Sequence, residues 1–286
     1  MGLTEQTEIV TEPTESAVER AGAESGSRQR RSRRALLSLK GPLLSILSVV
    51  AFIAVWQYLA SSGTVDRLYI SAPSDVWSAF VETVQDGSLV DHLIVSGKEL
   101  LVGFGLAALV GIAVGMLSGW NKTARSVLNP FVTAGYVTPR IALIPVVILW
   151  FGIGIESKVA MVFLMAVFPI VLAIETGVRT IDPQMVEVAD VFQASRRQLF
   201  RTVVIPATVP HIVSALKLGY GLALVGVVVG ELYAARGGIG YMIVRAGASY
   251  QVDKVFLGVV VFVVAGVLGT GMLSLVERRF SRWRTV

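Results

Sequence analysis

Six stretches of mainly apolar residues, each about as long as a membrane span, dominate the hydropathy pattern of this chain. They cover residues 43–61, 98–119, 127–151, 159–178, 212–234 and 255–276. An α-helix needs about 20 apolar residues to cross the hydrocarbon core, and it satisfies its own backbone hydrogen bonds there. Strands of a membrane barrel would alternate polar and apolar residues, which these stretches do not. The pattern predicts an all-α polytopic membrane protein with six transmembrane helices.

The composition leads to the same class of protein. Apolar residues make up 54% of the 286 residues and charged residues 16%, against about 25% in ordinary soluble domains. Too little polar sequence remains to cover a soluble core, which excludes almost any soluble enzyme of this size. The chain has no cysteine, so thiolate nucleophiles, disulfides and Cys-ligated metals are excluded. The net charge of +5 fits cytoplasmic flanks of a membrane protein, and no nucleic-acid partner is expected.

Lysine and arginine gather on one side of the predicted spans. Most of them lie before the first stretch, between the second and third, between the fourth and fifth, and after the sixth. This side is predicted to be cytoplasmic, and an even number of spans places both termini of this cell-membrane protein there. We expect a disordered basic tail over 1–40, the first span with an external amphipathic segment over 41–97, a five-span core over 98–280 and a cytoplasmic tail over 281–286.

The longest cytoplasmic loop, residues 179–211, carries the signals of two short helices. Asp182-Pro183 suits a helix start, because Asp caps the first amides and Pro needs no amide donor. Ser195-Arg196-Arg197-Gln198 has the form of a capping box, which predicts a second helix from Ser195. The residues that share one face of the first helix are Val188, Val191, Phe192 and Ser195. A compact folded knob and an amphipathic helix lying on the lipid both fit this pattern.

This loop resembles the EAA loop of bacterial ABC-importer permeases, whose pattern reads E-A-A, three residues, G, nine residues, I-x-L-P. The residues that fit in place are Glu187, Ala189, the branched Val203 and Pro206, with Ile205 a conservative change. Val188 replaces an alanine, and Gln193 replaces the glycine. That glycine allows the first helix to end in a left-handed turn, which costs another residue on the order of 1 kcal/mol.

Further segments resemble the nitrate/sulfonate/taurine branch of that family. They are residues 72–77, 149–154, 178–183 and 237–241. Their order and spacing extend the resemblance over roughly residues 70–280. It implies the fold of a type I ABC-importer permease, in which a homodimer forms the path for a small solute, here a nitrate-, sulfonate- or taurine-like anion. The implied partners are an ABC ATPase inside and a solute-binding protein outside.

The resemblance also implies where this chain meets the ATPase. Glu187, Ala189, Gln193 and Pro206 are expected in or beside the coupling element, and Phe192 as its apolar anchor. The chain has no G-x-x-x-x-G-K-[ST] motif to bind phosphates. We therefore expect this subunit not to be an enzyme and to hold no cofactor or metal, with ATP bound by the partner subunit.

Two residues are candidates for the translocation path or its gate. Arg140 lies in the third predicted span between Pro139 and Pro145, where an arginine costs at least about 2.5–3.5 kcal/mol unless it faces a bundle interior or wet cavity. One interpretation is that Arg140 is a gate or a contact for an anionic substrate. The other is that it is structural, and bonds either to an acidic side chain or to backbone carbonyls that lose their helical donors because of the prolines. Glu231, at the end of the fifth span, has either a path or gate role or an interfacial structural one. Glu175, in the fourth span, is expected to be solvated or interfacial.

Two G-x-x-x-G pairs, Gly111/Gly115 and Gly226/Gly230, allow close helix contact in the second and fifth spans. They fit packing within the chain or at a dimer interface. An ion-coupled secondary transporter is the alternative function, but it requires intramembrane acids and internal inverted repeats, and the pattern favours neither. A membrane scaffold or sensor would lack a folded coupling loop. The loop therefore favours the permease.

Overall fold

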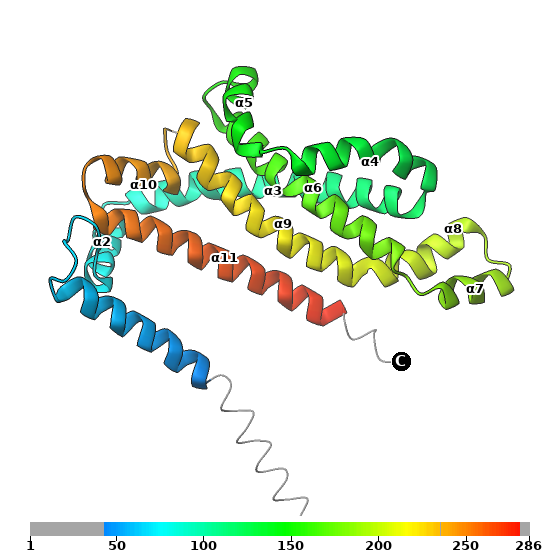
Figure 1. The fold of residues 1–286 in the computed structure, drawn as a ribbon, viewed down its shortest axis with the longest axis horizontal. Coiled ribbons are helices and arrows are strands. Elements are labelled where there is room, and N and C mark those ends of the chain that lie inside the picture. The colour runs from blue at the N-terminus through cyan, green and yellow to red at the C-terminus, as the bar shows by residue number, and fades with distance from the viewer. Residues whose placement is uncertain (1–42, 235, 281–286) are drawn as a thin grey trace, which may run out of the picture. The chain divides into compact units, whose positions relative to one another are not determined.

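The computed structural model describes residues 43–234 and 236–280, and every regular element in these ranges is a helix (Figure 1). The expectations for residues 1–40 and 281–286 lie outside the described residues. The chain divides into one unit that ends at Thr64 and a second from Val65 onward. The first unit contains the apolar helix Leu43–Ser61, which corresponds to the first predicted span.

The second unit contains a long-helix bundle and several short helices. Its elements are α2 (Pro73–Gln85), α3 (Ser88–Trp120), α4 (Lys122–Val137), η1 (Arg140–Leu143), α5 (Ile144–Phe151), α6 (Ile155–Arg179), α7 (Pro183–Val191), α8 (Arg196–Leu199), η2 (Phe200–Val204), α9 (Ile205–Ala234), α10 (Ile239–Ala248) and α11 (Val252–Phe280). Figure 1 shows α10 at one end of this unit and α7 with α8 at the other. These two ends are called the α10 end and the α7 end below.

Five of the described helices are long and apolar enough to cross a membrane, and a sixth span results if one bent pair of helices counts as one. The five are Leu43–Ser61, Ser88–Trp120, Ile155–Arg179, Arg196–Tyr233 and Val252–Arg279. This confirms the all-α polytopic fold. The second span begins ten residues earlier than the hydropathy pattern predicts, because polar residues of its first turns still continue the helix.

The third predicted span, residues 127–151, is wrong as a single helix. The structure divides this region into Lys122–Val137 and Arg140–Phe151, which meet at an angle of 91°. Thr138, just before Pro139, takes an extended conformation with φ −63° and ψ 130°. Proline disfavours the helical conformation of the residue before it and cannot donate an amide, so the helix ends there. Arg140 therefore lies at a break between helices rather than within a continuous span.

Helix α6 lies at the centre of the second unit, between α3 and α9. Close packing against α3 depends on a row of glycines along α3. A Cβ atom on Gly111 would lie 2.6 Å from Ile170 Cγ2, and one on Gly115 would lie 2.8 Å from Ile174 Cβ. Contacts this short do not occur between real side chains, so only glycine permits this helix separation. The first G-x-x-x-G pair therefore serves packing within the chain.

The glycines of α9 play the same part on the other side of α6. A Cβ atom on Gly226 would lie 2.8 Å from the Cα of Val162. Gly230 faces Lys158, and a Cβ atom on this glycine would lie 3.4 Å from the Lys158 Cα. Because the clash at Gly226 is with backbone, no side-chain movement could relieve it. Gly226 therefore allows α9 to approach the same central helix as α3, whereas a Cβ atom on Gly230 would lie at an ordinary contact distance.

Candidate coupling loop and buried polar clusters

The loop after α6 folds into two short helices whose ends are capped as the sequence predicts. Asp182 Oδ1 accepts a hydrogen bond from the Gln184 amide at 2.9 Å, and Pro183 takes the first helical position. Ser195 and Gln198 form a reciprocal capping box at the start of α8, with N–O distances of 3.3 and 2.8 Å. These local bonds satisfy amides that the first turn leaves without partners.

The turn between α7 and α8 is left-handed at Gln193, whose φ is 52°. The Gln193 amide donates to Asp190 O at 2.9 Å, and the Ala194 amide donates to Ala189 O at 3.0 Å. This bonding pattern is a Schellman motif, which usually has glycine in the left-handed position. The turn therefore has the sharp geometry that glycine favours, and Gln193 adopts it at a cost of about 1 kcal/mol.

The apolar face of α7 is exposed. Phe192 is 81% exposed and Val191 76%, and Val188 is also exposed. Leu199 of α8, by contrast, is buried, so α8 supplies the contact with the bundle. A folded helix that leaves its large apolar side chains uncovered is typical of a surface that binds another molecule.

The other predicted coupling residues lie on or after this helix. Glu187 is exposed on α7, Ala189 is half-buried, and Gln193 forms the turn. Pro206 is separate from them, since it is the second residue of α9 and follows the wide helical turn η2. In that turn the Ile205 amide donates to Phe200 O, five residues back. Such a turn accommodates the missing amide of Pro206 without ending the helix.

Arg140, at the break between α4 and η1, donates hydrogen bonds to one backbone carbonyl of α6 and one of α4. Its Nη1 donates to Met165 O at 3.0 Å, and its Nη2 donates to Tyr136 O at 3.4 Å. Met165 O is the carbonyl that Pro169, four residues later in α6, leaves without a helical donor. Tyr136 O lies in the last turn of α4, whose carbonyls also lack helical donors. The contacts of Arg140 match the structural interpretation of this residue.

Glu231 is 1% exposed and holds a glycine-rich turn at the α10 end. Its Oε1 accepts from Ser96 Oγ of α3 at 2.6 Å, and its Oε2 accepts from the Gly240 amide at 2.5 Å. Gly238, with φ 111°, leaves room for this carboxyl group, since a Cβ there would lie 2.8 Å from Glu231 Oε2. The glycines of the 237–241 segment thus allow the chain to wrap around a buried carboxylate.

A buried charge pair lies beside Glu231, and the sequence pattern does not predict it. Lys158 Nζ of α6 lies 2.5 Å from Glu99 Oε1 of α3, and the two residues are 5% and 0% exposed. Two charged residues near the ends of apolar helices resemble ordinary flanking charges. The spacing of Ser96 and Glu99 could have indicated this cluster, because it places two polar groups on one face of α3.

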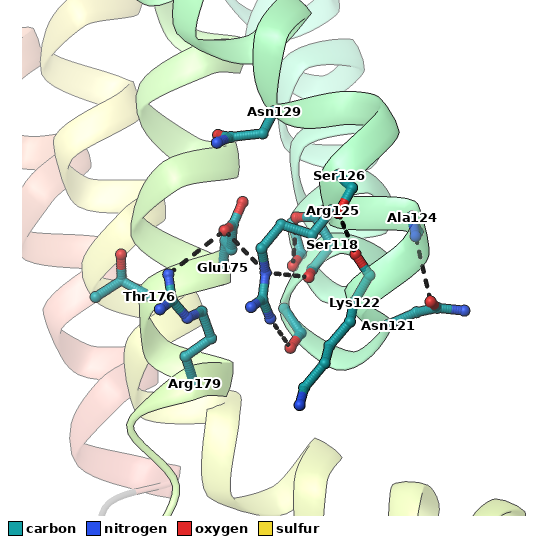
Figure 2. A network of polar contacts seen from close by, with 12 residues as sticks. Ser118, Asn121, Lys122, Ala124, Arg125, Ser126, Asn129, Glu175, Thr176 and Arg179 are labelled. Atoms are coloured by element: carbon teal, nitrogen blue, oxygen red, sulfur yellow. Dashed lines mark hydrogen bonds and ion pairs between the residues drawn. The ribbon is translucent and has the colours of Figure 1, made fainter.

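Glu175 is buried, so the expectation of a solvated or interfacial residue is wrong. Figure 2 shows it between Arg125 and Arg179, which lie 3.4 and 3.9 Å from Glu175 Oε1. Arg125 also donates to the terminal carbonyls of α3, to Ser118 O at 3.0 Å and Gly119 O at 2.8 Å. The cluster joins the ends of α3, α4 and α6 one turn before α6 continues into the loop with α7.

A bundle of long apolar helices with buried charge pairs is the architecture of a multi-pass membrane protein. Residues 109–282 match the family of binding-protein-dependent transport system inner membrane components. The chain belongs to this family. It is a transport permease component, which is the function that the loop predicts, and the ion-coupled secondary transporter is not favoured.

Relatives of similar length match most of the chain. The aliphatic sulfonates transport permease protein SsuC of Bacillus subtilis (strain 168) is 34% identical over 85% of this chain and 88% of its own length. The taurine transport system permease protein TauC of Escherichia coli (strain K12) is 29% identical over 84% and 89%. A chain of the MetNI methionine ABC transporter in inward-facing conformations shares the fold, with a TM-score of 0.60, 20% identity, and 70% and 97% coverage.

Proposed function

We propose that this chain forms the translocation path of an ATP-driven importer and receives its driving force at α7. A separate ABC ATPase binds the exposed face of Val188, Val191 and Phe192, and ATP is bound there and not in this chain. A solute-binding protein delivers the solute at the α10 end. The observation that carries the proposal is the exposed Phe192 on a helix fixed by caps at both of its ends.

The connection between α7 and the bundle is short and held by an ion pair, so a movement of α7 would be transmitted to the bundle. Only residues 180–182 separate α6 from α7, and the Arg125–Glu175 pair joins α6 to the ends of α3 and α4. A displacement of α7 by the ATPase would therefore reach three helices of the bundle together. Arg140 and Glu231 anchor the gates of the path, because each bonds to backbone where the helices are interrupted. Arg140 does so at the break between α4 and η1, and Glu231 at the turn before α10. The distribution of lysine and arginine supports a cytoplasmic position for both termini.

The substrate is proposed to be a sulfonate-, taurine- or nitrate-like anion. Two relatives named for aliphatic sulfonates and taurine support this class. Two copies of the chain are proposed to enclose one path as a homodimer, as the resemblance to type I ABC-importer permeases implies.

Replacement of Phe192 tests the coupling surface. Burial of a phenylalanine side chain contributes about 1.5–3 kcal/mol, so Phe192→Ala should weaken ATPase binding by roughly 10- to 150-fold. Phe192→Asp and Glu187→Arg should leave the permease folded but uncouple ATP hydrolysis from uptake. Tyr250→Asp, at an aromatic side chain of similar exposure (76%) at the α10 end, is the matched control for ATPase binding. Wild-type ATPase affinity and uptake in the Phe192 and Glu187 variants would refute the assignment.

The substrate class has its own test. Vesicles that contain the permease, its ATPase and its binding protein should accumulate a labelled alkanesulfonate only with internal ATP. Competition by unlabelled taurine, nitrate and a neutral pyrimidine then ranks the classes. Uptake competed by the neutral compound alone would overturn the anion proposal without affecting the coupling surface.

A further inference from the structure

Two carboxyl groups and one ammonium group share the buried space between α3, α6 and α9 at the α10 end. Glu99, Lys158 and Glu231 are 0%, 5% and 1% exposed. Ser96 and Glu99 lie one turn apart on α3, and Ser96 donates to Glu231, so the two carboxyl groups are neighbours in the same buried space. With all three groups ionised, this buried space would hold a net charge of −1. An uncompensated buried charge is costly because the interior screens it poorly.

The hydrogen bonds identify where a further hydrogen atom is needed. Both oxygens of Glu231 accept bonds, from Ser96 Oγ and from the Gly240 amide. Glu99 Oε1 accepts from Lys158 Nζ, but Glu99 Oε2 is buried and accepts no hydrogen bond from any residue that the structure describes. Two ionised carboxylates offer each other only acceptors. One proton on Glu99 Oε2 would turn it into a donor toward Glu231 and satisfy a buried oxygen.

We propose that Glu99 and Glu231 bind one exchangeable proton between them, and that this proton holds the glycine-rich turn before α10 against α3 and α6. The proton comes from solvent, and no covalent bond between heavy atoms changes. With it, the charges of Glu99, Lys158 and Glu231 sum to zero. Carboxyl pairs in other proteins share a proton for the same reason, since two like charges in contact cannot both ionise readily.

The groups that face this site come from four helices. Helix α6 contributes Lys158, and α10 contributes the amides of Ile239 and Gly240. Helix α3 also contributes His92, whose Nδ1 accepts from the Gly238 amide at 3.1 Å and is therefore unprotonated in this structure. Tyr241 and Arg245 of α10 lie near His92. His92 could also contribute to a pH dependence at the α10 end, so the pH measurements below include a control variant of His92.

Loss of the proton would leave two carboxylates and only one ammonium in this buried space. The repulsion acts between α3, which carries Glu99, and the end of α9, which carries Glu231. The turn from Gly238 to Gly240 is fixed to Glu231 by packing and by the Gly240 amide, so it would move with Glu231. Deprotonation would therefore loosen the α10 end and leave the α7 end unchanged.

Infrared spectroscopy of the purified full chain tests for the proton directly. At about pH 6, ordinary exposed carboxyl groups are ionised, so a band of a protonated carboxylic acid reports a buried one. We expect such a band in the wild type and its loss at high pH. Glu99→Gln and Glu231→Gln should each remove it, because each leaves a single carboxylate in this buried space, whose charge and that of Lys158 sum to zero. Glu175→Gln, which removes a buried carboxylate paired with arginine, should retain it.

The absence of a carboxylic-acid band from the wild type at pH 6 would overturn the proposal, and this measurement needs no variant to fold. A band that persists in both glutamine variants would overturn it as well. Neither result bears on ATPase coupling, because the measurement uses the permease without partners.

Thermal unfolding against pH gives a second test. A native state that holds one proton more than the unfolded state loses stability as pH rises, by up to tenfold in the folding equilibrium per pH unit. The apparent Tm of the wild type should therefore fall from about pH 6 to high pH. Glu99→Gln should remove most of this dependence, whereas His92→Asn, which keeps an acceptor for the Gly238 amide, should retain it. An equal pH dependence in the wild type and Glu99→Gln would refute the shared proton.

Discussion

Replacement of Arg140 by methionine should destabilise the protein by leaving a buried carbonyl without a donor. Methionine keeps an unbranched side chain of similar reach but has no N–H group. Met165 is 6% exposed, and its carbonyl receives its bond from Arg140 at 3.0 Å because Pro169 cannot supply one. A buried, unsatisfied acceptor costs about 1–3 kcal/mol. Loss of the guanidinium from the Tyr136 ring, whose centroid is 5.8 Å away, adds about 0.5–1 kcal/mol.

The structure also predicts how this loss can be repaired. Pro169→Ala restores an amide four residues after Met165, so the carbonyl regains a helical donor. In the Arg140→Met background, Pro169→Ala should therefore recover about 1–2 kcal/mol, whereas in the wild type it should have little effect. Arg140→Lys, which can bond one carbonyl but not both, should lie between the wild type and Arg140→Met.

Unfolding of the purified full chain in mixed detergent micelles measures this double-mutant cycle. If the two substitutions add to within about 0.5 kcal/mol, Arg140 does not compensate for Pro169 and the reasoning is refuted. Uptake by the repaired double variant then separates the two interpretations of Arg140. Normal apparent affinity for the substrate means that Arg140 is structural, and abolished uptake by a stable double variant means that it also contacts the substrate.

Three further substitutions test the packing and the loop. Gly115→Leu should destabilise the bundle by about 1–3 kcal/mol or prevent folding, because its side chain would clash with α6. Gly105→Leu is the control in the same unfolding assay and should be neutral, since no atom lies within 4 Å of the Cβ position of Gly105. Gln193→Gly should stabilise the α7–α8 turn by up to about 1 kcal/mol, measured as slower proteolysis of the loop, and faster cleavage would contradict the strain assigned to Gln193. Arg125→Ala should cost about 2 kcal/mol or more, since Glu175 then keeps only the longer pair with Arg179, and Arg125→Lys should cost less in the same detergent titration.

The class of protein and the local structure of the loop at residues 179–211 can be read from the order of the residues. Apolar stretches of span length predict helices, because a lipid environment admits few other backbone conformations. The Asp182 cap and the Ser195–Gln198 box depend on residues within three positions of each other, and both are present. Such caps are readable because their partners lie within one helical turn. The left-handed turn at Gln193 is different, because local preferences favour glycine there and only the structure shows that glutamine adopts it.

Which polar groups meet inside the bundle depends on contacts between residues that are far apart in the sequence. Ser96 and Glu231 are 135 positions apart, and Glu99 and Lys158 are 59 apart. Arg140 finds its carbonyl 25 residues later in another helix. In the sequence these residues look like ordinary flanking charges or a candidate substrate contact. Their roles depend on how closely glycine rows let α3 and α9 approach α6, and that approach is set by packing between helices rather than by the pattern within any one of them.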